Sequence, residues 1–487
     1  MISLILGIVY WRTLLPVVGY WGDMAKFAFL GKVLGTPHLS GYPTYLLLNH
    51  FWVSLIPRGT LAFKANLLSA VFSIIATWFL FGTLIRLQVR PLIAFFTTLV
   101  FGFSYSLWSY SLIAEVYTLN VAFTIAVIFL LIAWIQTRED KYFYLAALTY
   151  AISFGNHLTM VGLLPAFGYI VWVTDRKTFL DIKKILAVIL CILIGLSQYF
   201  YIVWRSNDLN TPFLEIDTQV FLRFITTFRH DAAFGFSLRE LIFQRLPITL
   251  GYIWRELSRL ILFSLWGMTH LHDRKINLFL IIGLIGETLF ALNLDGRETW
   301  VFFLPTYIIL SIYLGIGLQD VSKRVLPNPR YSIVWLVLPV FMLYLNYERV
   351  DQSDRVLHAR IVEKVLSTVQ SNAVIVVDEY DYACFFWYYL IGEGYESKNI
   401  YAFPIFFSGT EGIRSYLLHQ DLIELYPQRK SVPPGLPVYV QWTIADDLRA
   451  AGFNLEETET KYIYKLSTYE SGNYMIPPKG SGIPESG

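Results

Sequence analysis

The sequence predicts an all-helical membrane domain that crosses the bilayer many times and is followed by a small α/β domain. Of the 487 residues, 55% are hydrophobic and only 15% are charged, and the mean hydropathy is +0.51. Soluble domains carry a larger charged fraction. About eleven apolar runs are near the length that crosses a bilayer as a helix. After about residue 348, strand-like and helix-like segments alternate instead, which is typical of an α/β domain.

The apolar runs alternate with short polar connectors, and the connectors differ in charge. We expect spans at residues 2–19, 61–85, 91–110, 117–136, 143–156, 158–174, 185–204, 246–266, 276–293, 300–318 and 331–346. Threading them alternately places the Lys and Arg residues of 86–90, 138–141, 176–184, 274–275 and 323–330 on one side, whereas connectors 111–116 and 156–157 have none. The positive-inside rule makes the basic side cytoplasmic.

The first span has neither a basic leader nor a small-residue cleavage site, so we expect it to remain uncleaved. The opposite, extracytoplasmic face then receives Asp23, His38, Glu115, His157, the loop 205–245 and the turn 293–299. Acidic groups and histidines are costly near a bilayer, so their convergence on one face predicts a functional site there. Residues 42–57 have a helical period but are short, which predicts a helix lying on the outer surface.

The C-terminal part contains four strand-like runs, at residues 373–378, 399–404, 437–442 and 462–467. Helical patterns separate the first three, which favours a mostly parallel sheet. The end of the chain, PPKGSGIPESG, is typical of disorder. We therefore divide the chain into a transmembrane domain (1–347), an extracytoplasmic α/β domain (348–470) and a disordered tail (471–487).

Several function classes lack any support in the sequence. There is no glycine-rich phosphate loop, no GxGxxG, no HExxH and no Cys/His metal pattern. No basic block or aromatic motif predicts a nucleic-acid partner. The two cysteines, Cys191 and Cys384, suggest neither a disulfide nor a thiolate metal site. No DxD pair occurs in the first outer loop, so a divalent metal is not implied. The polar residues gather at one face without a clear internal repeat, which favours surface chemistry over translocation.

Two acidic residues on the outer face have both structural and chemical interpretations. Asp23 follows the first span, where it could cap a short helix or act as a base. Lys26, one turn later, is placed to pair with it and to lower its pKa. Glu115 lies between two apolar runs with no nearby Lys or Arg. It needs a partner across the bundle, or it serves as a negative charge at the start of the next helix.

Histidines and arginines on this face also keep two interpretations. His38 lies in TPHLSGYP, a loop shaped by proline and glycine, and is either a surface residue or a ligand. Asn156 and His157 could cap the following helix or face the same cavity. Arg297, in NLDGRET, suits a phosphate because its planar guanidinium binds two oxygens together, or it forms a salt bridge within the turn. Arg229 belongs to a mixed set in the loop 205–245, suited to an anionic headgroup or to solvation.

Several motifs resemble the membrane protein O-mannosyltransferase family whose animal member glycosylates plexin-type receptor domains. They are GD followed by HLSGYP and NLLSA, then FSYSLWSYSLIAEVYTLN, then GNHLTM, and later LNLDGRETWVFFLPTYIILSIYLGIGL and NAVIVVDEYDYACFFWYYL. EVYTLN and GNHLT are the most specific of them. The resemblance covers most of the chain. Two positions differ from the family pattern: Lys26 replaces a second acidic residue, and Leu39-Ser40 replace a double proline.

The resemblance implies a GT-C glycosyltransferase, which passes a sugar such as mannose from a polyprenyl phosphate to a hydroxyl, here a protein or glycan acceptor at the outer face of a prokaryotic inner or plasma membrane. It implies that Asp23 is the catalytic base. On this basis we predict that Glu115 acts with Asp23, that Arg297, Arg229 and His157 hold the donor phosphate, and that His38, Tyr42 and Asn156 orient substrate. No metal is assigned. A lipid-linked glycan transporter or scaffold, and an oligosaccharide polymerase or ligase, stay as alternatives.

Overall fold

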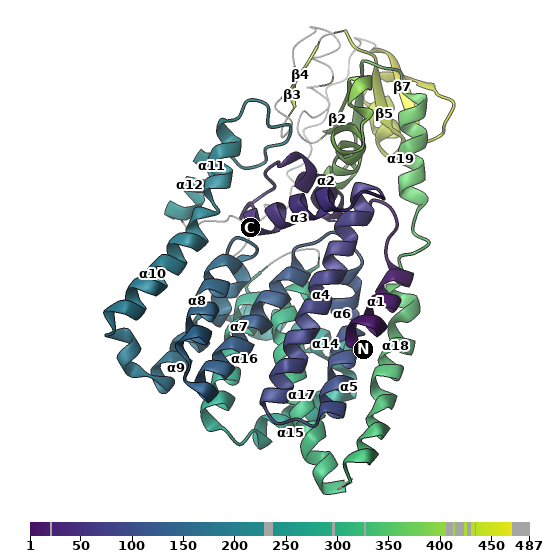
Figure 1. The fold of residues 1–487 in the computed structure, drawn as a ribbon. Coiled ribbons are helices and arrows are strands. Elements are labelled where there is room, and N and C mark those ends of the chain that lie inside the picture. Colours follow the sequence, from purple (N-terminus) through teal and green to yellow (C-terminus); the bar gives the residue numbers. More distant parts are fainter. Residues whose placement is uncertain are drawn as a thin grey trace.

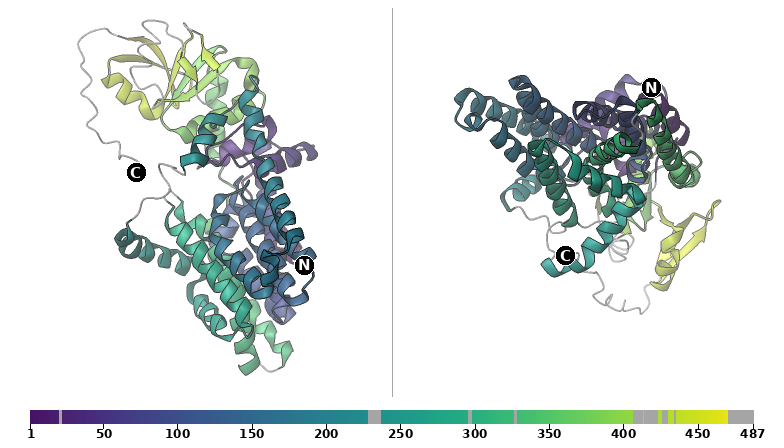
Figure 2. Two further views of the ribbon diagram at one scale, coloured as in Figure 1. Left: turned by 90° about the vertical axis from the view of Figure 1, so that its left-hand side faces the viewer. Right: turned by 90° about the horizontal axis from the view of Figure 1, so that it is seen from below.

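The computed structural model describes residues 1–19, 22–227, 237–294, 298–325, 328–405, 413, 423–425, 430–433 and 435–469. A long helical bundle carries the α/β domain at one end (Figures 1 and 2). The residues that matter for function lie at that end, which we call the site end.

The helices follow one another with short connections through the bundle (Figure 1). They are α1 (Ile2–Thr13), α2 (Met24–Val33), α3 (Pro43–Leu55), α4 (Leu61–Arg86), α5 (Pro91–Gly102), α6 (Tyr105–Ser111), α7 (Tyr117–Thr137), α8 (Asp140–Ser153), η1 (Leu158–Leu163), α9 (Leu164–Thr174), η2 (Arg176–Phe179), α10 (Ile182–Ser197), α11 (Phe200–Asn207), α12 (Thr218–Thr227), α13 (Leu238–Glu240), η3 (Leu241–Arg245), α14 (Leu246–Leu257), η4 (Ser258–Leu260), α15 (Ile261–His270), α16 (Arg274–Leu292), η5 (Thr299–Phe303), α17 (Leu304–Val325), η6 (Pro329–Leu336) and α18 (Val337–Val350).

Fewer helices than expected are long enough to span a membrane alone. Six helical stretches in the described residues meet the length and composition of a span, or seven if the bent pair α5 and α6 counts as one. Several of the about eleven predicted apolar runs are shorter or broken helices, which this length criterion does not count. The run 91–110 bends by 66° between Gly102 and Tyr105, and the run 246–266 divides into α14, η4 and α15.

Two short helices, α2 and α3, lie across the site end of the bundle (Figure 1). Pro43 fixes the first turn of α3, and the Thr60 hydroxyl accepts a hydrogen bond from the Phe63 N–H to begin α4. α3 exposes Phe51 and Leu55 on one side and buries Tyr45 and Leu46 on the other. The predicted short helix at 42–57 is therefore present, and its exposed apolar side suits a membrane surface.

The C-terminal domain comprises a five-stranded sheet in the order β2-β1-β5-β7-β6. Its elements are α19 (Leu357–Thr368), β1 (Ala373–Val377), α20 (Tyr380–Trp387), η7 (Tyr388–Gly392), η8 (Tyr395–Lys398), β2 (Ile400–Pro404), β3 (Ile423–Leu425), β4 (Lys430–Val432), β5 (Val438–Gln441), η9 (Trp442–Ile444), α22 (Ala445–Ala450), β6 (Phe453–Glu457) and β7 (Ile463–Tyr469). Strand β1 pairs in parallel with β2 and β5, but β7 pairs antiparallel with β5 and β6.

The sheet is thus half parallel, not mostly parallel as the sequence suggested, because β6 and β7 close it as a hairpin that the alternation did not reveal. Strand β6 and the small β3-β4 pair were not predicted. The fold class itself, a helical membrane domain followed by a small α/β domain, is confirmed. The division at residue 347 stays a prediction, and the tail 471–487 lies outside the described residues.

Helix α20 and the turn η7 attach the C-terminal domain to the site end. The Lys32 ammonium donates to the Gly392 carbonyl at 2.6 Å, and the Glu393 carboxylate accepts from the Leu61 N–H at 2.7 Å. The Ala62 N–H donates to the Tyr388 hydroxyl at 3.1 Å. The first N–H groups of a helix have no partner within it, so the C-terminal domain caps α4. Residues of α2, α3, β1 and α20 also share one hydrophobic core.

Two glycines allow α15 and α17 to pack backbone against backbone. A Cβ on Gly267 would lie 2.0 Å from the Tyr313 carbonyl oxygen, and one on Gly317 would lie 1.9 Å from that of Phe263. We expect Gly267→Val to destabilise the fold by about 1–3 kcal/mol, because the backbones must separate. Thermal unfolding of the purified variant measures this loss. Gly251→Val is the control, since a Cβ there meets nothing within 4 Å, and equal melting of the two variants would contradict the packing argument.

Candidate active site

A buried lysine links two carboxylates at the site end. The Lys26 ammonium lies 2.7 Å from Asp23 Oδ1 and 3.1 Å from Glu215 Oε2. Its side chain is 2% exposed, whereas that of Asp23 is 33% exposed. Asp23 occupies the N-cap position of α2, but its side chain makes no capping hydrogen bond. The capping interpretation of Asp23 is therefore wrong, and the predicted pairing with Lys26 is confirmed.

The same ammonium fixes the tautomer of His38. Lys26 Nζ lies 3.0 Å from His38 Nδ1, and since a charged ammonium can only donate, Nδ1 accepts and Nε2 carries the proton. Nε2 then lies 2.9 Å from the Tyr42 hydroxyl and 3.5 Å from Asp23 Oδ2. Lys26 therefore holds Oδ1 of Asp23, whereas Oδ2 lies beside the more distant His38 Nε2.

Glu215 reaches this network because its segment runs beside the end of α2. The Thr36 N–H donates to the Phe213 carbonyl at 3.0 Å, and the Glu215 N–H donates to the Thr36 carbonyl at 2.9 Å. The Arg205 guanidinium donates to the last carbonyls of α2, those of Val33 and Leu34. Arg205 is therefore part of the scaffold that brings Glu215 to Lys26.

Glu115 lies beside the network on the side opposite Glu215. Gly22, with φ of +59°, turns the chain so closely past Glu115 that a Cβ there would lie 3.8 Å from Glu115 Oε1. The side chain is buried, and the backbone of Val116 is the hydrogen-bond partner recorded for its carboxyl group. The sequence led us to expect a partner across the bundle, and among the described residues Lys26 acts on Glu115 through space.

The two acids have opposite electrostatic environments. Burial alone would raise the pKa of Asp23, but His38 and Lys26 lower it below its usual value. Burial and the charges of Asp23 and Glu298 raise the pKa of Glu115 well above its usual value. Burial alone would lower the pKa of Lys26, but the charges of Asp23 and Glu215 raise it well above its usual value. The pKa values of Asp23 and Glu115 are therefore shifted in opposite directions, the separation expected of an acid-base pair.

His157 and Asn156 border the same space. His157 packs against Tyr42, Tyr117 and Phe302, with ring centroids 5.6–6.2 Å apart. Its Nδ1 accepts from the Thr159 N–H at 3.2 Å, so it does cap η1. Burial, with His38 nearby, lowers the pKa of His157 to about 4, so its ring is neutral at pH 7. Asn156 donates to the Val116 carbonyl at 3.1 Å and thereby fixes the backbone next to Glu115.

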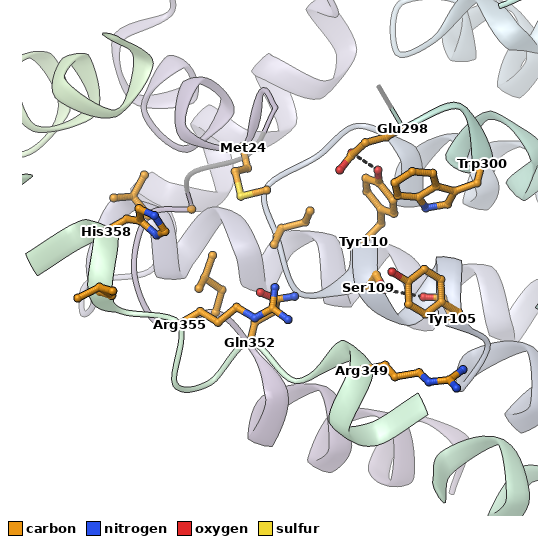
Figure 3. A pocket seen from close by; sticks show the side chains of 15 residues that line it. Met24, Tyr105, Ser109, Tyr110, Glu298, Trp300, Arg349, Gln352, Arg355 and His358 are labelled. Atoms are coloured by element: carbon orange, nitrogen blue, oxygen red, sulfur yellow. Dashed lines mark hydrogen bonds between the residues drawn. The ribbon is translucent and has the colours of Figure 1, made fainter. Parts of the chain in front are cut away.

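A pocket of about 570 Å³ opens beside Met24 and Glu298 (Figure 3). Gly19 and Met24, which flank Asp23 in the chain, line it, as does Glu298, whose carboxylate accepts a hydrogen bond from Tyr110. Its remaining lining is Leu15, Val18, Tyr105, Ser109, Ile113, Trp300, Arg349, Gln352, Arg355, Leu357 and His358. The apolar side chains and the cations together give an amphiphilic lining within the size range of small-molecule sites.

Some predicted residues cannot be placed. Arg229 and Arg297 lie outside the described residues, so their assignment to the donor phosphate stays a prediction. Asp23, His38, Tyr42, Glu115, Asn156 and His157 all converge at the site end. Among the described residues, no group of three or more His, Cys, Asp or Glu side chains is arranged to hold a metal ion.

Five further residues of the site were missed: Tyr110, Glu215, Glu298, Arg349 and Arg355. Glu298 stands in the NLDGRET turn that the sequence singled out for its arginine. Arg349 and Arg355 directly follow the last span, which is a position where cations at the membrane surface could have been noticed. Nothing local distinguishes Glu215, whose partner lies 189 residues away.

The architecture matches that of a known membrane enzyme. The chain superposes on ArnT from Cupriavidus metallidurans with a TM-score of 0.63 over 96% of both chains in the apo state, at 10% identity. The same protein bound to undecaprenyl phosphate gives 0.62, at 11% identity, over 96% of this chain and 97% of that one. The chain therefore has the GT-C fold of a multi-pass membrane protein.

Within that fold class, the sequence is similar to one family. Residues 23–180 match the model of the protein O-mannosyl-transferase TMEM260 N-terminal domain. The chain is 23% identical over 430 residues to protein O-mannosyl-transferase tmem260 of Dictyostelium discoideum, covering 76% of this chain and 52% of that protein. The TMEM260 protein of Mus musculus is 24% identical over 390 residues, covering 73% and 55%. The predicted resemblance is confirmed, and the chain spans about half the length of these relatives.

Proposed function

We propose that this protein is a glycosyltransferase that moves a hexose from a polyprenyl phosphate to a hydroxyl group. The observation that carries the proposal is Asp23, which pairs with Lys26 and directly precedes Met24, a lining residue of the amphiphilic pocket. The names of the relatives, protein O-mannosyl-transferases, support mannose as the hexose and a protein Ser or Thr hydroxyl as the acceptor. The undecaprenyl phosphate in the ArnT title supports a lipid phosphate as the carrier.

The proposed reaction is a displacement at the anomeric carbon. The acceptor hydroxyl oxygen forms a bond to that carbon while its proton passes to Asp23 Oδ2, the oxygen that Lys26 does not hold. The bond from the anomeric carbon to the phosphate oxygen breaks, and its electron pair leaves with the polyprenyl phosphate. Orienting the hydroxyl and providing the base are the two contributions of the protein. Lys26 keeps Asp23 ionised before the step, and His38 and Tyr42 position its free oxygen.

The protonated Glu115 supplies a hydrogen bond to the sugar or acceptor in this scheme, which gives a pH dependence. Because its pKa is raised, Glu115 keeps its proton until the pH rises through that raised value, so we expect transfer to slow on the alkaline side. Asp23, whose pKa is lowered, stays ionised down to acid pH. Glu115→Gln cannot ionise, so its rate profile should lose the alkaline decline while Glu115→Ala loses activity. An unchanged alkaline decline in Glu115→Gln would remove this role.

The site end is proposed to be extracytoplasmic, in the inner or plasma membrane of a prokaryote. Arg86, Arg138 and Lys184 gather at the other end of the bundle, which suits the cytoplasmic side. We expect a cysteine introduced by Asp447→Cys, exposed on α22, to react with a membrane-impermeant maleimide in intact cells. Lys141→Cys, at the opposite end and 60% exposed, should react only after lysis. Both native cysteines are buried and provide the background. The reverse labelling pattern would invert the orientation.

The acceptor class is tested with the purified protein, labelled polyprenyl-phosphate mannose or glucose, and a lysate of the source cell. We expect label on proteins, released by alkaline β-elimination, as for a sugar on a Ser or Thr oxygen. Label on a glycan would instead support a polymerase or ligase. If the lipid-linked sugar survives intact with every hexose tried, the transporter or scaffold alternative gains support and the enzyme proposal fails.

A further inference from the structure

The pocket beside Asp23 is electrically asymmetric. At one end Glu298 faces the acids, since the charge of Asp23 acts on Glu298 and both act on Glu115. Arg349, Arg355 and His358 line another side of the pocket, which we call the basic end; they lie on the last turn of α18, the segment after it and the first turn of α19 (Figure 3). A ligand that fits this arrangement carries a neutral polar part at the acidic end and an anion at the basic end.

The two arginines of the basic end, Arg349 and Arg355, form no ion pair with a described carboxylate. Nearby, the Arg255 guanidinium stacks over Tyr105 and Trp300 at 4.7 and 5.1 Å. The Trp300 Nε1 donor is buried and has no acceptor among the described residues. The Trp300 N–H and the guanidinium groups of Arg349 and Arg355 therefore surround one cavity as donors without acceptors among the described residues, an arrangement that suits an anion with several oxygens.

The position of the basic end fits an anion anchored in the membrane. Arg349 stands one residue before the end of α18, which belongs to a stretch long and apolar enough to span a membrane, and the end of a span is where a headgroup phosphate is expected. Leu15, Val18 and Leu357 line the same pocket and could cover the first apolar carbons of a lipid. An anion without a hydrocarbon chain would leave these apolar side chains uncovered.

From these observations we infer that Arg349 and Arg355 form the subsite that binds the phosphate of a polyprenyl phosphate, with Trp300 as an additional donor. This inference rests on the proposed function, because it makes the pocket the donor site and places the sugar between the phosphate and Asp23. It assigns the phosphate to residues that the structure describes, whereas the sequence predicted Arg229 and Arg297 for this role. Both arginines are exposed toward the pocket, so replacing them leaves the core untouched.

The test measures binding of polyprenyl phosphate to the full-length protein in detergent, without any transfer reaction. Arg349→Gln and Arg355→Gln should each weaken binding roughly tenfold, because each removes a charge-assisted hydrogen bond. Arg355→Lys, which keeps the charge, should retain part of the affinity. Arg360→Gln is the matched control, since Arg360 is an exposed arginine on α19 outside the pocket.

Polyprenol, which lacks the phosphate, and inorganic phosphate, which lacks the lipid, complete the comparison. We expect neither to compete well with polyprenyl phosphate. Equal affinity of all variants for polyprenyl phosphate would overturn the subsite, and inorganic phosphate binding as tightly as the lipid would overturn its assignment to a lipid. Arginine-dependent binding without any sugar transfer would leave the subsite standing and reject the proposed function. Normal transfer and normal lipid affinity in a variant that carries both Arg349→Gln and Arg355→Gln would reject the subsite and leave the proposed function standing.

Discussion

Asp23→Asn is expected to slow hexose transfer by about 10²–10⁴-fold, the usual contribution of a general base. Asparagine keeps the shape of the side chain and can still contact His38, but it cannot accept the hydroxyl proton. The measurement is the rate of label transfer from polyprenyl-phosphate mannose at saturating donor. The affinity for polyprenyl phosphate should stay near that of the natural protein, since Asp23 is not among the residues that line the pocket with the arginines.

A matched control for this variant is Asp447→Asn, which removes an exposed carboxylate from α22 far from the network. It should transfer at the normal rate. The role of Asp23 is contradicted if Asp23→Asn keeps full activity, or if it loses activity only in proportion to a loss of folded protein.

Lys26→Met is expected to cost about 3–5 kcal/mol of stability, because it leaves two partly or fully buried carboxylates without their shared cation. Methionine has nearly the same length, so the loss comes from charge and not from a cavity. The thermal unfolding midpoint of the purified protein measures the effect. Lowering the pH should recover part of the loss, since protonation removes the uncompensated charge of Glu215.

Lys32→Met is the control, because Lys32 on the same helix donates to the Gly392 carbonyl without a recorded carboxylate partner. Its loss should be nearer the 1 kcal/mol of an ordinary hydrogen bond. Melting of Lys26→Met within a degree or two of the natural protein would mean that the ammonium does not hold the network together.

The local part of the site could be predicted from the sequence because spacing determines it. Asp23 and Lys26 are one helical turn apart, and helix geometry alone brings them together. Glu215 could not be predicted, because its contact depends on how the segment after α11 runs beside the end of α2. Similarly, the capping interpretation of Asp23 was reasonable locally, but the carboxylate turns to Lys26, whose charge is a stronger partner than a backbone N–H.

The limits on predicting the fold have the same cause. Hydropathy located the apolar segments well, yet it could not show that the chain bends between α5 and α6 or that α14 and α15 divide one run. The four predicted strands are present, but pairing direction depends on tertiary connections, and the β6-β7 hairpin made the sheet half antiparallel. The sequence assigned the phosphate to Arg229 and Arg297, which lie in loops outside the described residues. The described pocket is instead lined by Arg349, at the end of α18, and Arg355, just after it.

The most direct test of the central proposal counts both products of one reaction. Purified protein is incubated with polyprenyl-phosphate mannose labelled in the sugar, and the polyprenyl phosphate formed and the mannose bound to acceptor are measured together. A glycosyltransferase gives one polyprenyl phosphate for each mannose transferred, and Asp23→Asn gives neither. Lipid that crosses or stays in the membrane with its sugar still attached would contradict the account.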